Sequence, residues 1–521
     1  MESKSFIRKE TAGNRRLEET MMPKKATPEP AFALDPASYE QAVQEEAPGG
    51  SALDFTLEVA NRIPLAVDNP IEGHEADFSV RIWVKGAPDS WEAYEFVAAY
   101  DIRDEKESGW KLGIQENGAW YWTASNGAER YDYRPTPVRQ SIRDGGWHQL
   151  AFVYGGRTKE ARLYYDGRNV AIYNTEKVPA INASLQLSIG GKPQGDLSEW
   201  HTFNGMIGPM DVYACRLTDD EVERDFAAAR SEEPNGELAA AGREASSKQD
   251  GIVSELKVMS FNIWHGGNET GRETGPARVV DLIREVDADI VCLQETYGSG
   301  PRIADALGYY MYLSSTNLSI LSRYPIEETR PVFVSFHCGL AGIRLSDRQR
   351  IVVSSLWLHW LPDYWSDFLK PERMPLAAIM EGERDKRLAE MQAILAELGA
   401  VTWEADDTPV LLCGDYNNGS HLDWTEASAS HHNGYAVEWP VSKLLADSGY
   451  KDSFREVHDD PVQEPGFTWS PRFKESMQDR IDYIYYKGAK LQASGSRVID
   501  THPVSFPSDH AAVVTTFRVS E

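Results

Sequence analysis

The sequence predicts two folded domains of different class, an antiparallel β-sandwich over residues 51–230 and a layered α/β domain over residues 255–521. The chain has 521 residues, enough for about two to four domains of ordinary size. Short segments with alternating polarity fill its first half, whereas apolar strands alternate with amphipathic helices in its second half. Between them, residues 231–254 are rich in Gly, Ser and Glu, a composition typical of a linker.

The composition is that of a globular protein with an excess of acid. Hydrophobic residues make up 41% of the chain and aromatic residues 11%, which is enough for ordinary cores. Against 53 basic residues stand 81 acidic ones, a net charge of −28 that both halves share. Such a charge disfavours attraction to nucleic acid phosphates over most of the surface. We therefore do not expect a nucleic acid coat protein, and binding to DNA would require a locally basic groove.

The termini and the cysteines carry no targeting or disulfide pattern. Cys215, Cys292, Cys338 and Cys413 form neither a CxxC motif nor a disulfide framework. The first 30 residues lack the apolar run of a secretory signal peptide, and no stretch of 18 apolar residues follows. We expect residues 1–50 to be a mobile leader and the chain to have no transmembrane segment. As written, the sequence predicts a cytoplasmic protein, and an extracellular one if an export signal is missing from it.

In the first domain, segments 78–84, 147–154, 161–167 and 185–191 alternate apolar and polar residues between turn residues. A helical pattern appears only at residues 217–230, which favours an antiparallel sandwich. The pieces WHQLAFVYGG, LYYDGRNVAIY, LSIGG and FNGMIGPMDVYACRLTDDEVE, in this order, resemble the laminin-G-like or concanavalin-A-like family, a jelly-roll sandwich. The resemblance covers most of residues 52–230. It implies a glycan, glycoprotein or Ca²⁺ ligand, with a purely structural or dimerising role as an equal alternative.

In the second domain, apolar strands alternate with helices. A helix starts at Pro276, where apolar residues recur at helical spacing, and a longer one covers about residues 375–399. Strands that are apolar on both faces, with helices between them, predict a layered α/β domain. The predicted strands are residues 256–264, 288–295, 318–322, 350–360, 409–415, 480–486 and 511–519.

Polar side chains stand where these apolar strands end, although a buried strand has no structural need for them. Any one of them alone would ordinarily be a cap or a turn residue. Uncompensated acids at several buried strand ends are costly, however, so we expect the set to form one polar site. Its members are Asn262, Glu295, His359, Asp415, Asn417, Asp482, Asp509 and His510.

The pieces SFNIW, LQE, LHW, GDYNN, RIDYI and SDH, in this order, resemble the endonuclease/exonuclease/phosphatase superfamily over residues 256–519. The resemblance implies a four-layered α/β/β/α sandwich with its site at one edge of the paired sheets. It also implies a metal-dependent phosphoric diester hydrolase in which water attacks the phosphorus in line with the leaving group. Tyr416 replaces the usual Phe of the GDFN motif and keeps an aromatic ring there.

The resemblance and the chemistry of each side chain suggest individual roles. Glu295 and Asn262 offer hard oxygen ligands that suit Mg²⁺, with Mn²⁺ or Ca²⁺ as alternatives, and one or two metals remain open. Asp415 would take a proton from the attacking water or orient it, and Asn417 would donate to a phosphoryl oxygen, as at the family's GDxN positions.

The histidines complete the predicted machinery. His510 would donate to the transition-state phosphate, and a carboxylate is needed to fix its tautomer. We choose Asp482 for that role, while Asp509 is the alternative and could instead touch the metal site or a water. His359 stands where sphingomyelinase-like and deoxyribonuclease-like members of the family carry a histidine, and it would contact the phosphate or the leaving group.

Weaker candidates for substrate binding lie close to these motifs. Aromatic residues near a phosphate site suit stacking on a sugar or a base, or holding a choline-like cation. Closing a small core is an equal alternative for the tryptophans, and a plain surface position is the alternative for the histidine. The candidates are His265, Trp360, Trp365 and Trp424.

Three functions follow, in order of preference. The first is a Mg²⁺-dependent phosphodiesterase that acts on a glycan-, lipid- or small-molecule-linked phosphodiester, because the acidic surface argues against nucleic acid. The second is a nuclease that acts on DNA or RNA. The third is a non-catalytic carbohydrate-binding or adhesion protein in which the sandwich carries the function.

Overall fold

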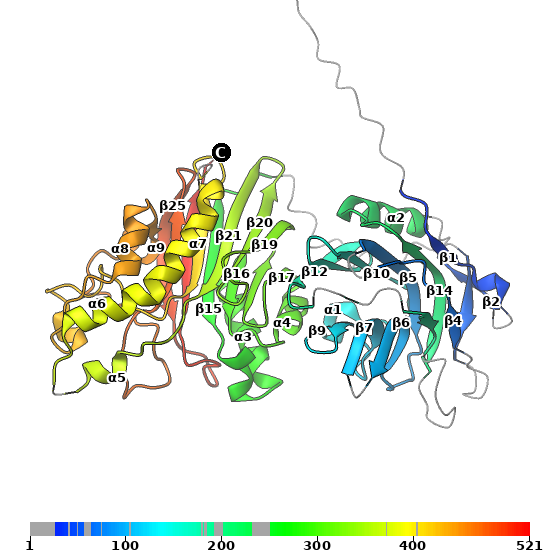
Figure 1. Ribbon diagram of the computed structural model, residues 1–521, viewed down its shortest axis with the longest axis horizontal. Coiled ribbons are helices and arrows are strands. Elements are labelled where there is room, and N and C mark those ends of the chain that lie inside the picture. The colour runs from blue at the N-terminus through cyan, green and yellow to red at the C-terminus, as the bar shows by residue number, and fades with distance from the viewer. Residues whose placement is uncertain are drawn as a thin grey trace, which may run out of the picture.

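The computed structural model describes residues 27–39, 42–48, 50–56, 64–73, 76–103, 106–178, 181, 185–191, 202–231, 251–370, 372–402 and 405–520. Two bodies lie side by side along its longest axis, the first formed by residues up to 231 and the second by residues 251–520 (Figure 1). Most of the predicted linker, residues 232–250, lies outside the described residues. No helix among the described residues is long and apolar enough to span a membrane.

The first body is the predicted antiparallel sandwich of two sheets. Trp110 and Trp122 of one sheet pack on Phe152 of the other, with ring centroids 5.6 and 5.3 Å apart. The helices are α1 (Pro137–Gln140) and α2 (Asp219–Ser231). One sheet contains, in spatial order, β2 (Ala42–Ala47), β3 (Gly50–Asp54), β14 (Gly205–Tyr213), β5 (Phe78–Gly86), β10 (His148–Gly155), β11 (Glu160–Tyr165) and β12 (Arg168–Asn174). The other contains β4 (Leu65–Val67), β13 (Leu187–Ile189), β6 (Tyr94–Arg103), β7 (Lys106–Ile114), β8 (Trp120–Asn126) and β9 (Arg130–Tyr133).

The strands of this domain begin earlier in the chain than the sequence predicts. Residues 1–26 of the expected leader lie outside the described residues. The described residues between 27 and 50 form strands, because β1 (Phe32–Leu34) pairs with β14 and β2 pairs with β3. A short 3-10 helix, η1 (Pro36–Ser38), lies between β1 and β2 and is capped by the Asp35 carboxylate. Three-residue strands such as β1 are too short to show a period in the sequence, which is why the prediction of a leader up to residue 50 was wrong for this segment.

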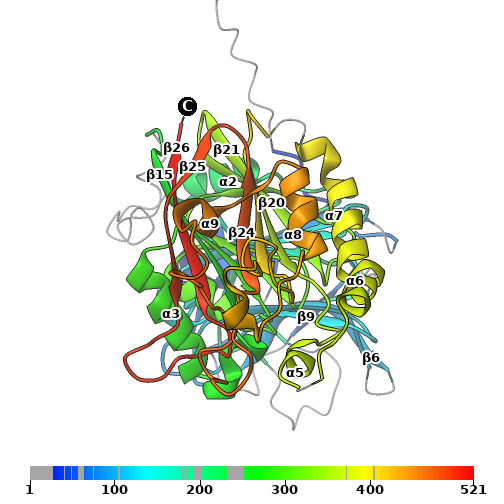
Figure 2. The same ribbon diagram turned by 90° about the vertical axis from the view of Figure 1, so that its left-hand side faces the viewer.

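The second body is a four-layered sandwich of two sheets covered by helices on both sides (Figures 1 and 2). The apolar faces of the sheets meet in a buried layer that contains Cys292, Val353 and Leu411. One sheet runs β17 (Tyr310–Leu313), β18 (Leu318–Ser322), β16 (Ile290–Gln294), β15 (Glu255–Asn262), β26 (Ala512–Val519) and β25 (Leu491–Ile499). The other runs β19 (Ile326–Pro331), β20 (Cys338–Ser346), β21 (Gln349–Trp357), β22 (Val410–Asp415), β24 (Asp482–Lys487) and β23 (Lys451–Asp452).

Helices fill the outer layers of this body. The longer ones are α3 (Thr274–Val286), α4 (Gly300–Leu307), α6 (Leu376–Asp385), α7 (Arg387–Thr402) and α8 (Pro440–Asp447). The shorter ones are η4 (His265–Thr270), α5 (Trp365–Phe368), η5 (Ala429–His432) and α9 (Ser453–Val457). The single helix predicted over residues 375–399 is in fact two, α6 and α7, because the backbone of Lys386 leaves the helical region at φ −126° and ψ −88°. The sequence carries a signal of this break, since residues 381–387 (EGERDKR) interrupt the apolar stripe between Met380 and Leu388.

The two bodies share one sheet. β12 of the first pairs in parallel with β17 of the second, Ile172 opposite Tyr312 and Tyr173 opposite Leu313, so that a 14-stranded sheet crosses the boundary. Buried polar contacts accompany this pairing. The Gln140 amide donates to Asp305 at 2.9 Å, and the Thr136 hydroxyl donates to the same carboxylate. Two domains that did not pack on each other would not bury such contacts, and no pattern in the sequence indicates them.

Candidate active site

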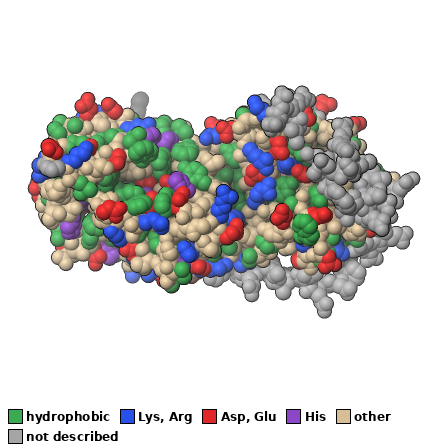
Figure 3. Space-filling model, turned by 90° about the horizontal axis from the view of Figure 1, so that it is seen from below, with side chains coloured by type: hydrophobic (Ala, Val, Ile, Leu, Met, Phe, Trp, Pro, Cys, Tyr) green, Lys and Arg blue, Asp and Glu red, His purple; other side chains and the backbone are tan. Residues whose placement is uncertain are grey.

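The predicted polar residues converge at one edge of the paired sheets. Asp415 ends β22 and is the Cα partner of Asp482, which begins β24. Asn262 ends β15, and Glu295 follows the end of the neighbouring strand β16. His510 lies just before β26. This edge faces downward in Figure 1, and Figure 3 shows histidines among acidic and hydrophobic side chains on the face that is seen from below.

His510 lies between two aspartates in a buried position. Its Nδ1 is 2.9 Å from Oδ2 of Asp482, and its Nε2 is 3.9 Å from Oδ2 of Asp415. Burial on its own would lower the pKa of His510, but the charges of Asp482 and Asp415 outweigh it and raise that pKa well above its usual value. Asp482 is thus the carboxylate in contact with Nδ1 of His510, and the imidazolium form is favoured.

Asp415 is the most connected acid of the site. Its Oδ2 accepts from the Asn262 amide at 3.1 Å and from the Asn417 amide at 3.2 Å, and its Oδ1 accepts from the Asn417 backbone at 2.9 Å. Burial raises the pKa of Asp415 to about 7, because it outweighs the opposing charge of His510 and is reinforced by Asp482. A carboxylate whose pKa lies near neutral pH can accept a proton at physiological pH.

Asn417 is held away from the orientation expected of a phosphate donor. Its amide also donates to the Leu358 carbonyl at 2.9 Å, so both amide hydrogens face protein acceptors. The residue has a φ of +50°, in the left-handed region where asparagine is enriched. In this arrangement Asn417 fixes the loop after β22 and the end of β21, and a donor role would require its amide to turn.

Glu295 lies on the opposite side of Asn262 from Asp415. Its Oε1 accepts from the Asn262 amide at 3.3 Å, and its Oε2 accepts from the His265 backbone at 3.0 Å. The Glu295 backbone donates to the side chain of Asn317 at 3.1 Å, which fixes a residue whose φ is +55°. Asn262 thus connects the two acids, and the exposed ring of His265 stands at the rim beside them.

The arrangement fits a bound divalent cation. Carboxylate oxygens of Asp415 and Asp482 lie within 4.8 Å of each other, and Oδ1 of the buried Asp482 has no hydrogen-bond partner; the imidazolium of His510 beside them is a counter-charge and not a metal ligand. Burial raises the pKa of Asp509, and Glu295 reinforces this although His510 opposes it. Several acids at one buried edge need positive charge, and oxygen donors of this type suit a hard cation.

His359 is placed by contacts to both its backbone and its ring. Its backbone donates to Oε2 of Glu390 at 3.0 Å, and its Nδ1 accepts from the Leu361 backbone at 3.0 Å. An accepting Nδ1 places the proton on Nε2. Burial and the nearby charge of Lys386 lower the pKa of His359, so that this ring is a neutral donor, in contrast to His510.

The sequence analysis missed charged residues of the α6–α7 junction that hold the site loops. Arg387 is fully buried, pairs with Glu383 and donates to the carbonyl groups of Trp360 and Pro362 at 2.9 and 2.7 Å. The other oxygen of Glu383 accepts from Asn418 at 3.2 Å. The signal was present in the sequence as opposite charges four residues apart on a helix, which is also the pattern of an ordinary surface pair.

The four weaker candidates fall into different places. Trp360 is 52% exposed beside His359, and His265 lies at the rim. Trp365 is half-buried and stacks on Trp439. Trp424 is 2% exposed, stacks on His432 and donates its indole N–H to Asp479. The prediction that Trp424 contacts substrate is therefore wrong, because its ring belongs to a core cluster beneath the loops.

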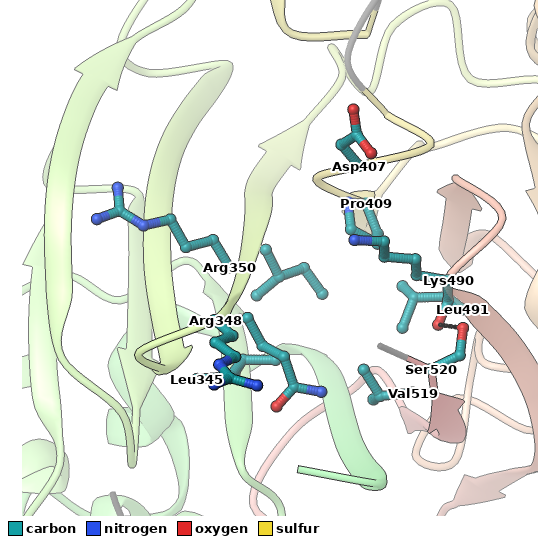
Figure 4. A pocket seen from close by; sticks show the side chains of 11 residues that line it. Leu345, Arg348, Arg350, Asp407, Pro409, Lys490, Leu491, Val519 and Ser520 are labelled. Atoms are coloured by element: carbon teal, nitrogen blue, oxygen red, sulfur yellow. Dashed lines mark hydrogen bonds between the residues drawn. The ribbon is translucent and has the colours of Figure 1, made fainter. Parts of the chain in front are cut away.

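A separate pocket lies at the other end of the sheets (Figure 4). Its lining includes Arg348, just before β21, and Val519, at the end of β26. The site is at the opposite ends of these strands, near Trp357 and His510. This pocket is thus not part of the site.

Each half of the chain matches the model of a known protein family. Residues 259–510 match the model of the Endonuclease/Exonuclease/phosphatase family, and residues 61–223 match that of the Concanavalin A-like lectin/glucanases superfamily. These matches confirm the two resemblances and their order along the chain.

Individual relatives match the second half. "Uncharacterized protein F14F9.5" of Caenorhabditis elegans is 29% identical over 286 residues, 50% of this chain and 90% of the relative. "DNA repair nuclease APEX1" of Danio rerio is 25% identical over 317 residues, 57% of this chain and 94% of the relative. The crystal structure of TDP2 from Caenorhabditis elegans covers 57% of this chain and 82% of its own, with 18% identity and a TM-score of 0.36.

Proposed function

Since residues 259–510 form a domain of the endonuclease/exonuclease/phosphatase family and residues 61–223 a concanavalin A-like domain, we propose that this chain is a Mg²⁺-dependent phosphodiesterase. The observation that carries the proposal is the placement of His510. Asp482 lies 2.9 Å from its Nδ1 and Asp415 lies 3.9 Å from its Nε2, at an edge shared with Glu295 and Asn262. This combines a cationic donor, a carboxylate able to accept a proton and oxygen ligands in one place.

Each residue has a role that its contacts support. Asp415 orients the attacking water and accepts its proton. His510, kept protonated by Asp482, donates to the phosphoryl oxygens as negative charge grows on them, and the neutral His359 donates from Nε2 to the phosphate or the leaving oxygen. Glu295 and Asn262 would hold Mg²⁺, with Asp509 close by. When bound, the ion polarises a phosphoryl oxygen and stabilises charge on the leaving oxygen.

For the substrate we favour a diester linked to a small molecule, a glycan or a lipid. The charges next to the site are mixed. His265 pairs with Glu269, Lys386 pairs with Glu390, and the guanidinium of Arg472 lies 5.0 Å from the ring centroid of Trp264. A long polyanion binds through a run of cations, whereas this rim suits a compact substrate.

A nuclease is the second candidate function. It is favoured by the similarity to the zebrafish relative named a DNA repair nuclease, which extends over 94% of that protein. The acidic surface weighs against it. The glycan ligand expected for the first domain remains a prediction, since a shared fold does not determine a ligand.

The test is hydrolysis by the purified full chain, with Mg²⁺ or with a chelator. The panel contains bis(p-nitrophenyl) phosphate, sphingomyelin, a phosphodiester-linked glycan and plasmid DNA. His510→Gln should lose activity on every substrate that the wild type hydrolyses, whereas His458→Gln, whose ring bonds the Ser496 carbonyl away from the site, should keep it. Chelator-resistant hydrolysis, or an active His510→Gln protein, would rule the proposal out, and fastest cleavage of DNA would favour the nuclease.

A further inference from the structure

Two aromatic side chains continue the row of catalytic acids across the sheet. Trp357 is the Cα partner of Asp415, which is itself the partner of Asp482. His337 extends this pairing by one strand, because the Trp357 backbone donates to the His337 carbonyl at 2.9 Å. Paired residues of neighbouring strands project from the same face of a sheet. The rings of His337 and Trp357 therefore stand on the same face as the two carboxylates.

These rings belong to a wall of aromatic side chains, which consists of Phe336, His337, Trp357, His359 and Trp360. The rings of His337 and Trp357 stack at 5.8 Å and 25°, and those of His359 and Trp360 lie within 8° of parallel at 6.5 Å. Phe336 meets Trp357 edge-on at 5.8 Å. Trp360 is half exposed, and the other four are partly exposed. The wall leads from the acids outward to the surface.

The far end of the wall meets the first domain. The Lys177 ammonium, which is exposed, lies 5.8 Å from the ring centroid of Phe336. The segment that carries it is held on both sides. The Asn174 amide donates to the Ser314 carbonyl of the second domain at 3.0 Å, and the Lys177 carbonyl accepts from Asn126 at 3.3 Å. The backbone that carries this cation of the concanavalin A-like domain is thus held at the end of the wall.

Resting on the phosphodiesterase function, we propose that the substrate carries a flat ring beside the scissile phosphate and a second anionic group beyond it. The ring stacks on the wall, and the anionic group pairs with Lys177. The acids, the rings and Lys177 follow one another in the order of the scissile phosphate, the base and a further phosphate of a nucleoside phosphodiester. Aromatic side chains bind nucleobases by stacking, and a single lysine pairs with one phosphate rather than with a long polyanion. The first domain then contributes directly to substrate selection.

Three esters with the same p-nitrophenolate leaving group separate these contributions. Ethyl p-nitrophenyl phosphate has no ring beside the phosphate on its retained side. Thymidine 5′-(p-nitrophenyl phosphate) adds the nucleoside, and its 3′-phosphorylated form adds the distal anion. In the wild type, kcat/KM should rise at each addition. Trp357→Ala and Trp360→Ala should each reduce the gain from the nucleoside by about ten-fold.

Lys177→Ala should reduce only the rise in kcat/KM that the 3′-phosphate brings, by roughly three- to five-fold. Lys177→Arg should restore this rise. Lys85→Ala is the matched control, because Lys85 lies 6.0 Å from the Trp147 ring in the same domain and has no place at the wall. If Lys177→Ala leaves that gain intact, or lowers kcat/KM equally for all three esters, the role of Lys177 is refuted.

A binding measurement tests the inference without catalysis. Thymidine 3′,5′-bisphosphate should quench tryptophan fluorescence of the wild type and bind more weakly to Trp357→Ala and Lys177→Ala. Failure to bind overturns the inference even if ethyl p-nitrophenyl phosphate is hydrolysed, in which case the phosphodiesterase function stands. Competition by an oligothymidylate identifies the source of the nucleotide. If the oligothymidylate binds more tightly than thymidine 3′,5′-bisphosphate, the natural substrate is the end of a nucleic acid strand. If the two bind with equal affinity, it is a free small molecule. Both substrates carry the ring and the anion proposed.

Discussion

Asp482 lies 2.9 Å from Nδ1 of His510, and both side chains are buried. Burial disfavours the imidazolium form, and the carboxylate restores it. Replacing Asp482 by Asn should therefore lower the pKa of His510, so that its proton is lost at lower pH than in the wild type. We expect kcat to fall by about 10²- to 10⁴-fold and the alkaline limb of the pH–rate profile to move to lower pH. Asp500→Asn, an exposed change, is the control, and an unmoved alkaline limb would contradict this role.

The buried pair of Arg387 and Glu383 yields a stability prediction. Arg387→Met leaves the Glu383 carboxylate buried without its cation, which should cost about 3–5 kcal/mol of unfolding free energy. The double variant Glu383→Gln, Arg387→Met should recover much of that loss, because it removes the unpaired charge. Urea denaturation measures both, with the exposed Arg384→Met as control. Equal losses in the single and the double variant would show that the pair matters for packing and not for charge.

In the first domain, His148 is predicted to make stability depend on pH. Its ring nitrogens lie 2.9 Å from Asp144 and 2.9 Å from Asp166. Burial opposes the charged form, but the two carboxylates prevail and raise the pKa of His148 to about 9. Because the folded-state pKa lies above the unfolded value of about 6.5, the stabilisation is complete below pH 6.5 and is lost as pH rises through 9.

The size of this contribution is on the order of 2 kcal/mol once the solvent exposure of Asp144 is considered. Urea denaturation at pH 6.5 and pH 9.5, for the wild type and for His148→Gln, isolates it. The wild type should lose more stability than the variant over this interval. A difference between the two proteins that stays constant with pH would mean that His148 is not charged in the folded state.

The contact of Gln140 with Asp305 should make the two domains unfold together. Asp305→Ala removes the acceptor of the buried Gln140 amide and of the Thr136 hydroxyl, at a cost of about 2–4 kcal/mol. We expect a single calorimetric transition in the wild type and two in this variant. The exposed Glu285→Ala should keep one transition. Two transitions in the wild type itself would contradict this coupling.

The sequence predicted the site better than its surroundings, for a physical reason. Acids such as Asp415 and Asp482 are anomalous at the ends of apolar strands, so their convergence on one polar site could be predicted from the pattern itself. Trp424 and Trp360 look alike in the sequence, yet one is in a core and the other is exposed, because loop packing decides which ring meets solvent.

Contacts between distant segments were also invisible to the sequence. The approach of Asn174 to Ser314 depends on how two domains dock, and neither residue type signals it. Likewise, the sequence does not show that the backbone of His337 pairs with that of Trp357. Local periodicity predicts elements and their buried faces, whereas the pairing of one element with another depends on the whole fold.

The parallel pairing of β12 with β17 also covers an edge strand of the second domain. If the first domain were removed, β17 would be the outermost strand of its sheet, with the unpaired backbone groups beside Tyr312 and Leu313 open to any extended segment. Exposed edges of this kind recruit other chains and seed aggregates. β12 occupies that edge, so the sandwich acts as an intramolecular cap on this strand of the second domain.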